Sequence, residues 1–244
     1  MSDIAEQVAR LSADNARLLE RMAESERRFR MISKGVLRVQ EAERGRIARD
    51  LHDGVGQALT ALKIELELLE QHAGSTGSSI AARLTDLKGL VNRTVQDVKA
   101  LSHALRPPML DDLGLVPTLR WVVRTFQKRT AVQVRLTCEP MEERLDPDLE
   151  TLVYRVVQEA LTNAAKYADS PDVTLTLECS DARLRLLIQD YGRGFDVDAA
   201  LTGDASDRGF GLRAMRDRVQ LFGGRFKVTS APGRGTTIQV EVPL

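Results

Sequence analysis

Residues Glu43–Gln57 read E-R-G-R-I-A-R-D-L-H-D-G-V-G-Q. Apolar residues recur through this stretch and beyond it at intervals of three or four, which predicts an amphipathic helix. They are Ile47, Leu51, Val55, Ala58, Leu62, Leu66 and Leu69. His52 follows Leu51 by one residue, so it lies about 100° round the helix, at the edge of the apolar stripe and within reach of solvent. Gly54 and Gly56 each cost a helix about 1 kcal/mol relative to alanine, which indicates a close approach or a local bend.

The pair His52-Asp53 has two interpretations. A histidine beside an aspartate on a helix is most often part of a solvated face. The alternative is a nucleophilic imidazole, because neutral imidazole has a free lone pair near pH 7. The adjacent carboxylate would then orient the ring and accept the proton that the ring loses on attack. Motifs farther along the chain favour the second interpretation.

Composition limits the class of protein. The 244 residues suffice for one large domain or two small ones, and 43% of them are hydrophobic, enough for a packed core. Charged residues make up 29% but balance to a net charge of zero, which argues against a nucleic-acid binder. Cys138 and Cys179 fit no metal or disulfide spacing and suit a reducing cytosol. No apolar run approaches the ~20 residues of a membrane span, so we expect a cytoplasmic chain without one.

Residues 1–40 are predicted to form a parallel coiled coil, because a heptad repeat runs from Ile4 to Val39. The d positions are Ile4, Leu11, Leu18, Ile32 and Val39, with Ser25 interrupting, and the a positions are Val8, Asn15, Met22, Phe29 and Val36. Asn15 at an a position is a device that sets the register of a parallel dimer. A single amphipathic helix that docks on its own domain is the alternative, but the charged intervening residues favour the dimer.

Residues 41–108 are predicted to form a helical hairpin. The His52 helix should end near His72, and Gly74–Ser79 should form a turn. A second helix should carry an apolar stripe until Pro107 and Pro108 end it. That stripe comprises Ile80, Leu84, Leu87, Val91, Val95, Val98, Leu101 and Leu105. Two such hairpins around a dimer axis would bury these wide stripes in a four-helix bundle. His72 and His103 are expected at the surface.

Residues 109–115, M-L-D-D-L-G-L, are expected to be a linker, and residues 116–244 a separate domain. Helical patterns cover 116–129, 146–168 and 211–222, and alternating patterns predict strands at 132–138, 173–179, 183–190, 225–230 and 236–242. Asp146 and Pro147 are the expected N-cap and first residue of the long helix. Helices on one face of a mixed sheet make a two-layer α/β sandwich. The fold class is therefore α plus α/β.

The long helix contains Q-E-A-L-T-N-A-A-K-Y-A, in which Glu159, Asn163 and Lys166 share one face. An asparagine oxygen can ligate Mg²⁺, a glutamate can orient the metal or a water, and a lysine can hold a phosphate. Charged residues at helical spacing are also common on a plain solvated face.

Three glycine-containing segments follow. Asp190 ends a strand, where its carboxylate can accept a hydrogen bond from an adenine amine, and Gly192 and Gly194 permit close approach of a ligand. A run from Asp196 to Arg208 resembles a mobile lid and precedes Gly209-Phe210-Gly211-Leu212, which opens a helix whose N–H groups favour an anion. Gly235 and Thr236 open the last strand. Each glycine pair alone is equally well explained as a turn, but together these segments predict a nucleotide site.

The combined motifs resemble the Bergerat-type ATPase fold shared by histidine kinases, gyrase-type topoisomerases, heat-shock-protein-90 chaperones and a mismatch-repair family. The His52 stretch, with L-R-P after the second helix and L-D-D-L-G-L beyond it, resembles the nitrate-sensor/DesK-like class of sensor histidine kinases. The resemblance covers roughly residues 40 to 244. It implies that His52 accepts the γ-phosphoryl group of ATP and that Asp53 is its general base. Gln57 completes H-D-x-x-x-Q, which positions water to dephosphorylate the partner.

The resemblance also implies a set of nucleotide ligands. Asn163 would ligate Mg²⁺ with support from Glu159, Lys166 would contact phosphate, and Asp190 would bind the adenine. The pocket and its lid would comprise Gly192, Gly194, Gly209, Gly211, Leu212, Gly235 and Thr236. The implied partners are a second copy of the chain and the receiver domain of a response regulator, whose aspartate takes the phosphate from His52.

The sequence departs from the family pattern at Tyr167, where the family usually has histidine, and mildly at Ala214 and Asp217, which replace glycine and glutamate. Three other functions remain open. The first is a phosphatase-biased regulator with slight autokinase activity, and the second is a nucleotide-binding scaffold that only sequesters a partner. The third is a Bergerat serine kinase of the anti-sigma type, which would need neither His52-Asp53 nor the hairpin.

Overall fold

The computed structural model describes residues 2–72, 78–139, 144–180, 182–202 and 207–244. The chain divides into two compact units, Met1–Glu41 and Ala42–Leu244. In the described ranges, no helix has both the length and the apolar content required to cross a lipid bilayer.

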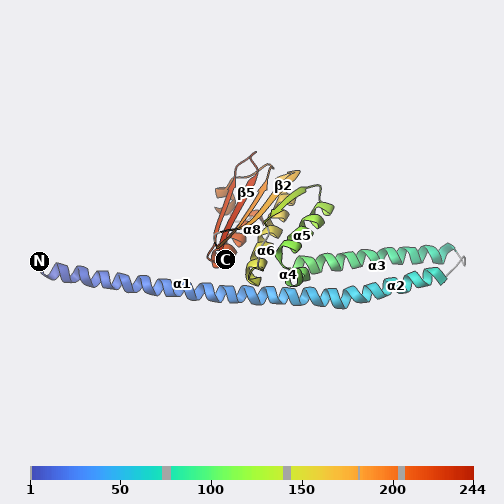
Figure 1. Ribbon diagram of the computed structural model, residues 1–244, viewed down its shortest axis with the longest axis horizontal. Coiled ribbons are helices and arrows are strands. Elements are labelled where there is room, and N and C mark those ends of the chain that lie inside the picture. The colour runs from blue at the N-terminus through green and yellow to red at the C-terminus, as the bar shows by residue number, and fades with distance from the viewer. Residues whose placement is uncertain (1, 73–77, 140–143, 181, 203–206) are drawn as a thin grey trace. The chain divides into compact units, whose positions relative to one another are not determined.

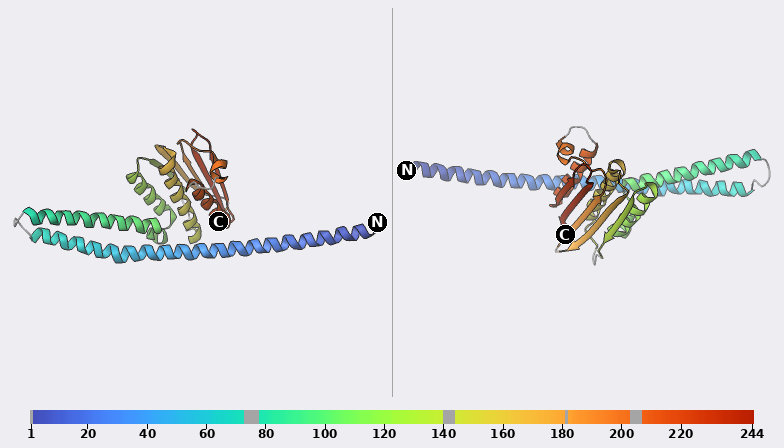
Figure 2. Two further views of the ribbon diagram at one scale, coloured as in Figure 1. Left: turned by 180° about the vertical axis from the view of Figure 1, so that it is seen from behind. Right: turned by 90° about the horizontal axis from the view of Figure 1, so that it is seen from above.

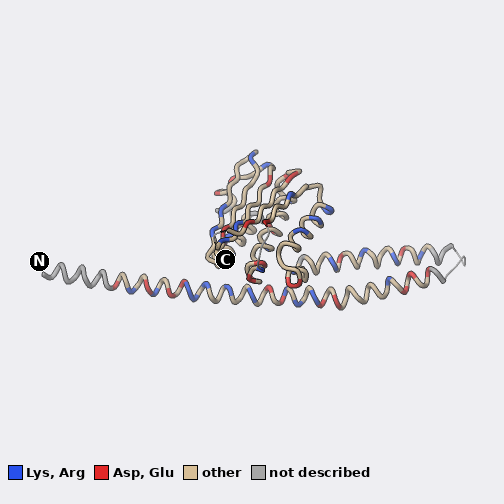
Figure 3. Tube along the Cα trace, in the orientation of Figure 1, with Lys and Arg blue, Asp and Glu red and all other residues tan. Residues whose placement is uncertain are grey.

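Helix α1 spans Ser2–Asp50, which confirms helix over the heptad region. Within the first unit, apolar residues of the repeat are exposed to solvent. These include Leu18, Met22, Phe29, Ile32, Val36 and Val39. Basic and acidic residues are interspersed along the same helix (Figure 3). Arg28 pairs with Glu24, and Arg30 pairs with Glu26, each across one helical turn. A long helix with charged flanks and an uncovered apolar seam is the pattern expected of one strand of a coiled coil.

The helix that carries His52 is not uniformly α-helical, contrary to the prediction. Residues Leu51–Gly56 form a π-helical segment, η1, and the α-helix resumes as α2 at Gln57–His72. Gly54 and Gly56 weaken the α-helical preference here, which explains why the wider turn forms at this point. Short π-helical turns occur frequently at functional sites. The local bend that the two glycines indicated is therefore a change of helix type around His52.

Helix α3, Ser78–Leu105, runs antiparallel to α2, as predicted (Figure 1). It begins before the expected Ile80, and most of the predicted turn lies outside the described residues. The hairpin buries Leu66, Val91 and Val95, with Leu59 and Leu84 packed against them. Other residues of the predicted stripes remain exposed in the single chain, among them Val55, Leu62, Leu69, Leu87 and Leu101. One hairpin therefore leaves much of its apolar surface uncovered.

The expected linker at residues 109–115 is not an extended connection. Pro108–Leu113 form a short helix, α4, and helix α5 begins at once and spans Leu115–Arg129. Leu110 and Leu115 are 1% and 2% exposed and belong to the core of the C-terminal domain. The two buried leucines flank the polar residues Asp111, Asp112 and Gly114, which suggested an exposed connection.

A buried carboxylate fixes this segment. Glu150 is 2% exposed and forms an ion pair of 3.0 Å with Arg144. Its Oε1 also accepts a hydrogen bond of 3.3 Å from the Leu115 N–H, at the first residue of α5, and Arg144 Nη2 donates to the Leu110 carbonyl at 2.8 Å. A carboxylate at a helix N-terminus satisfies an otherwise unpaired amide and stabilises the helix dipole. The segment is thus anchored in the domain at Leu110 and Leu115.

We expect Leu110→Ala to lower the free energy of unfolding by about 2–5 kcal/mol, because it removes a fully buried side chain and leaves a cavity. Leu113 in the same helix is 59% exposed, so Leu113→Ala should change stability by no more than about 0.5 kcal/mol. Urea unfolding followed by circular dichroism measures both. Equal, small effects would mean that this segment is a linker after all.

The C-terminal domain contains a five-stranded mixed sheet in the order β1-β2-β3-β5-β4. The strands are β1 Gln133–Cys138, β2 Asp172–Ser180, β3 Arg183–Asp190, β4 Arg225–Ser230 and β5 Thr236–Pro243. Strand β1 pairs in parallel with β2, with Val134 opposite Val173, and all other pairs are antiparallel. The predicted strands are therefore confirmed, and no boundary shifts by more than one residue.

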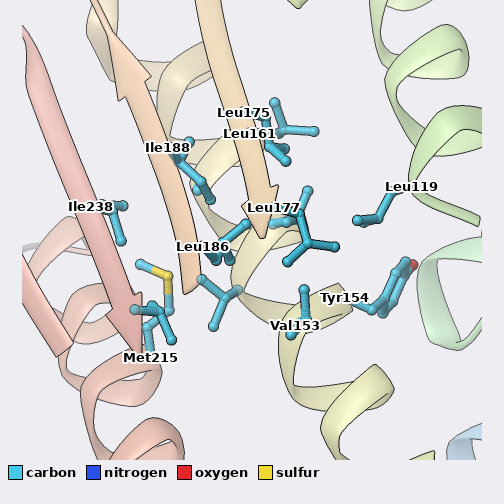
Figure 4. Close-up of a cluster of buried hydrophobic side chains, with 14 of the residues drawn as sticks. Leu119, Val153, Tyr154, Leu161, Leu175, Leu177, Leu186, Ile188, Met215 and Ile238 are labelled. Carbon is cyan, nitrogen blue, oxygen red and sulfur yellow. The ribbon is translucent and has the colours of Figure 1, made fainter. Parts of the chain in front are cut away.

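Helices cover one face of this sheet, as the alternating patterns predicted (Figure 2). Leu175 and Leu177 of β2 oppose Ile188 and Leu186 of β3, and all four side chains point into the core. Figure 4 shows them packed against Leu119 of α5, Val153 and Leu161 of the long helix, and Met215. Side chains of the opposite face, such as Arg185 and Gln239, are exposed. The domain is a two-layer α/β sandwich.

The long helix α6 spans Pro147–Asn163, and Asp146 caps it by accepting a hydrogen bond of 2.9 Å from the Asp148 N–H. The predicted continuation to Ala168 is a second π-helical segment, η2, at Ala164–Ala168. Within the expected lid, Val197–Thr202 form a helix, α7, that the sequence analysis missed, and residues 203–206 lie outside the description. Helix α8 spans Asp207–Leu221 and so begins before the predicted Gly211.

Candidate functional site

The residues of the His52 motif lie on the hairpin and are accessible to solvent. His52 and Asp53 are exposed in η1, and Gln57 is exposed at the start of α2. The spacing of five residues between His52 and Gln57 spans one wide turn of helix, so the three polar side chains gather on a short length of it. The expectation that solvent reaches His52 is confirmed.

A cavity opens in the C-terminal domain between α6, η2, β3, β5 and α8, and we call it the inner cavity. It encloses about 490 Å³ of space not filled by protein atoms, part of it open to solvent. Its lining includes the predicted site residues Asn163, Asp190, Gly194, Leu212 and Thr236, together with Tyr167 and Phe195. Residues from four segments of the sequence therefore meet in one mostly apolar hollow.

Asp190 is fixed in the wall of this cavity. Its Oδ1 accepts hydrogen bonds from the backbone N–H of Gly192 at 3.0 Å and of Thr236 at 3.2 Å. Within the described part of the chain, Oδ2 makes no hydrogen bond and is available to a donor in the cavity. An oriented carboxylate in an apolar pocket can discriminate a ligand by the position of a single N–H group.

The glycines around Asp190 make room for neighbouring protein atoms. A Cβ at Gly192 would overlap the Ala168 carbonyl, and one at Gly194 would overlap the Ala231 carbonyl. A Cβ at Gly235 would overlap the carbonyl of Asp190 itself. Gly194 and Gly235 also have φ values of 59° and 67°, a region that favours glycine. The glycines thus let the loops close tightly around Asp190.

The face predicted for Glu159, Asn163 and Lys166 opens on a second hollow, which we call the outer cavity. Asn163 Nδ2 donates to Glu159 Oε1 at 3.3 Å, which leaves the amide oxygen of Asn163 as an acceptor. Asn163 lines both cavities, and Glu159, Lys166 and Gly211 line the outer one. A Cβ at Gly211 would overlap Glu159 Oε1, so this glycine lets α8 approach α6. The two cavities are therefore adjoining parts of one site.

The remaining predicted residues do not line either cavity. Gly192 and Gly235 contact Asp190, the first through its N–H and the second against the Asp190 carbonyl. Gly209 is buried within α8. His52, Asp53 and Gln57 also lie outside both cavities. The structure thus brings together the predicted nucleotide ligands, with the phosphoacceptor candidate on a different element.

Two supporting residues were missed by the sequence analysis. Ser170 is 5% exposed, and its hydroxyl donates to the Asp172 carbonyl at 2.7 Å and accepts from the Tyr191 N–H at 3.2 Å. It ties the end of η2 to the residue after Asp190. Arg155 is 7% exposed in the middle of the apolar face of α6. A charged residue inside a run of buried apolar residues was the signal that could have identified it.

His103 is not the surface residue that was predicted. Its ring lies 4.2 Å from the ring of Trp121, centroid to centroid, and its buried Nδ1 has no hydrogen-bond partner among the described residues. Burial lowers the pKa of His103, and the nearby His52 and Lys99 act in the same direction. The last turn of α3 therefore packs against α5 through a neutral imidazole.

We expect acidification to weaken this contact. Because the folded pKa lies below the ordinary value of about 6.5, the unfolded chain binds the proton first as pH falls. The stabilising contribution of the neutral ring is complete above that pH and is lost as pH falls toward the folded pKa. Trp121 is the single tryptophan, so its fluorescence should titrate with a midpoint below 6.5. The titration should vanish in His103→Gln, and a midpoint at or above 6.5 would contradict the prediction.

Two family models of known proteins match separate segments of this chain. A family model described as "Histidine kinase" matches residues 43–110, and one described as "Histidine kinase-, DNA gyrase B-, and HSP90-like ATPase" matches residues 148–244. The chain is 35% identical over 215 residues to the oxygen sensor histidine kinase NreB of Staphylococcus carnosus. It is 32% identical over 210 residues to the signal transduction histidine-protein kinase/phosphatase DegS of Brevibacillus brevis. The chain belongs to the sensor histidine kinases. The match over residues 43–110 places this kinase in the nitrate-sensor/DesK-like class.

The alignments cover 88% and 86% of this kinase but only 60% and 53% of NreB and DegS. The chain thus spans little more than half the length of the curated relatives that it matches. Among solved structures, the histidine kinase domain of the blue-light activated histidine kinase from Erythrobacter litoralis aligns with 77% of this chain and 94% of that one. The TM-score is 0.48 and the identity is 20%.

Proposed function

We propose that this kinase transfers the γ-phosphoryl group of ATP to His52 and then to an aspartate on the receiver domain of a response regulator. The observation that carries the proposal is the anchored carboxylate of Asp190 in an apolar cavity, beside the polar group of Asn163 and Glu159. The same chain presents an exposed His52-Asp53 pair on a separate hairpin. A nucleotide site and a separate acceptor are the two components that histidine phosphorylation requires.

In this proposal the adenine lies in the inner cavity and donates its amine hydrogen to Asp190 Oδ2. The triphosphate extends past Asn163 toward Lys166, which is exposed at the edge of the outer cavity. Leu212 and Phe195 provide apolar contacts, and Thr236 contributes the amide that orients Asp190. The glycines act indirectly, because they allow the loops to hold that geometry.

The residues present fit a bound Mg²⁺. Among the described residues, no cluster of three or more His, Cys, Asp or Glu side chains could hold a metal. Mg²⁺ is, however, commonly bound by one or two protein groups together with substrate phosphates. The free amide oxygen of Asn163 would be one ligand and Glu159 would hold that amide in place. The ion would neutralise charge on the phosphate oxygens.

At the acceptor, the lone pair of the His52 imidazole attacks the γ-phosphorus. The bond from that phosphorus to the bridging oxygen breaks, and ADP leaves with the electron pair. The ring then carries an extra positive charge and loses its N–H proton to Asp53. His52 remains accessible to a receiver domain because it lies on an exposed part of the hairpin. Positioning and charge neutralisation supply most of the rate enhancement in such reactions.

The same proposal includes a homodimer. The exposed apolar seam of α1 and the uncovered hairpin residues Val55, Leu62 and Leu101 support it. Two hairpins around a two-fold axis would cover these residues in a four-helix bundle. The interspersed charges beside the seam are suited to interhelical ion pairs.

A phosphatase-biased function is the second candidate, because DegS is named a kinase/phosphatase and Gln57 is exposed one turn after His52. In that case Gln57 would orient a water toward the phosphorylated aspartate of the regulator, and autophosphorylation would be slight. Both candidates use the same hairpin surface.

The test is incubation with γ-labelled ATP and Mg²⁺. The expected product is labelled protein whose label is stable to alkali and labile to acid, since a phosphoramidate has this stability. A labelled chain that is stable to acid would indicate a serine kinase. Binding of ATP without labelling would favour the phosphatase-biased function, or a scaffold if a phosphorylated receiver domain is also left unchanged.

A further inference from the structure

A residue of the phosphoacceptor helix lines the cavity that the proposed function assigns to the phosphates. Arg44 of α1 contributes to the outer cavity together with Glu159, Asn163 and Lys166 of the C-terminal domain. Arg44 and the C-terminal domain belong to the same compact unit of the chain. The cavity encloses about 970 Å³ of unfilled space, including the part open to solvent.

Close packing of α1 on the end of α3 brings Arg44 to this position. Gly45 is buried, and a Cβ there would lie 3.2 Å from Arg106 Cδ. Ala48 is fully buried, and its carbonyl accepts a hydrogen bond of 2.8 Å from the buried Ser102 hydroxyl. Two small residues on one side of α1 therefore allow the helices to touch beside Arg44.

The end of α3 is in turn fastened to α6. The Tyr154 hydroxyl donates to the His103 carbonyl at 3.1 Å, and Arg155 Nη2 donates to the Leu105 carbonyl at 2.5 Å. These are carbonyls of the last helical turn, which have no partner within the helix. The contacts of α1 with α3, and of α3 with α6, together place Arg44 beside the face of α6 that carries Glu159 and Asn163.

The charge around the outer cavity suits a polyphosphate. Arg44, Arg155, Lys166 and Arg218 line it, against one carboxylate, that of Glu159. Arg155 is engaged with Gln158 Oε1 at 2.8 Å and with the Leu105 carbonyl. Arginine is well suited to phosphate because its planar guanidinium can donate two parallel hydrogen bonds.

We propose that Arg44 is a phosphate-binding residue that the phosphoacceptor helix supplies to the nucleotide site. The inference rests on the proposed function, since it takes the ligand to be a nucleoside triphosphate. Arg44 precedes His52 by eight residues, which is about 12 Å along a helix. Arg44 therefore holds the triphosphate in a state that precedes transfer, and the C-terminal domain has to move along the hairpin to reach His52. By linkage, a bound triphosphate stabilises this contact between the hairpin and the domain.

The test measures the affinity of the full chain for a non-hydrolysable ATP analogue with Mg²⁺, and separately for adenosine, by calorimetry. Arg44→Gln should lower the affinity for the analogue about five-fold, which is the upper range for a solvent-accessible ion pair. The affinity for adenosine should not change. Arg44→Lys should lie between Arg44→Gln and the native chain. The matched control is Arg46→Gln, because Arg46 is exposed on the same helix and is occupied by Glu43 and Asp50 at 2.9 Å each. This control should bind both ligands as the native chain does.

Equal binding of the analogue by Arg44→Gln and the native chain would overturn the inference and leave the proposed function intact. An equal loss of affinity for the analogue and for adenosine would also overturn the inference, because that pattern indicates a general disturbance of the domain. Failure of the native chain to bind either ligand would refute the proposed function itself, and the inference with it.

Discussion

Replacement of His52 by glutamine should abolish phosphorylation of the kinase while leaving ATP binding unchanged. Glutamine has a similar size and polarity but no lone pair basic enough to attack phosphorus. His52 is exposed and lines neither cavity, so its loss should disturb neither the fold nor the nucleotide site. The expected loss of label is complete, because His52 is the acceptor in the proposed reaction. Labelling with γ-labelled ATP, together with calorimetric binding of ATP, measures both properties.

His103→Gln is the matched control for this experiment. His103 lies near enough to His52 for the two charges to interact, but its Nδ1 is buried and its ring lies on Trp121. The variant should therefore still be labelled. Label that persists in His52→Gln, or that disappears only in His103→Gln, would show that the acceptor has been assigned to the wrong residue.

Replacement of Asp190 by asparagine should change the base specificity of the site. The asparagine oxygen can still accept the amide hydrogens of Gly192 and Thr236 that Oδ1 accepts now. The amide nitrogen then takes the place of Oδ2 and presents a donor to the amine of adenine. Two facing donors leave a buried group unpaired, at a cost of about 1–3 kcal/mol, so ATP affinity should fall by roughly ten- to one-hundred-fold. Inosine triphosphate carries a carbonyl at that position, and the variant should bind it more tightly than the native chain does.

Calorimetric titration of both nucleotides into both proteins tests this exchange. Asp172→Asn is a suitable control, because Asp172 is an exposed aspartate at the start of β2. It should bind both nucleotides as the native chain does. If Asp190→Asn binds neither nucleotide, the carboxylate has a structural role and does not determine base specificity. Unchanged ATP affinity would mean that the adenine binds away from Asp190.

Short-range signals allowed much of the fold to be predicted. The alternation in residues 183–190 predicted β3 with its observed boundaries, because strand periodicity is a local property. Asp146 and Pro147 predicted the start of α6, since an N-cap acts on the amides of the next turn. The linker at 109–115 was wrong because the burial of Leu110 depends on residues of α6 that lie far along the chain.

The features of the site also divide into those that local spacing predicts and those that depend on tertiary contacts. Glu159, Asn163 and Lys166 could be placed on one face from their spacing alone, and Glu159 and Asn163 are in contact. The anchoring of Asp190 could not be predicted, because one of its two amide donors belongs to Thr236, on another strand. The packing of His103 on Trp121 was missed for a similar reason, since the two residues lie on different helices.

The sequence by itself determined the helices, the strands, the acceptor motif and the chemical character of the nucleotide ligands, because these follow from periodicity and residue type over a few turns. Only the tertiary structure decided the π-helical turns at Leu51–Gly56 and Ala164–Ala168, the tight closure of the glycine loops around Asp190, and the position of Arg44 beside the outer cavity. These features depend on contacts between segments distant in sequence. Their energies arise from packing and hydrogen bonds that local propensity does not contain.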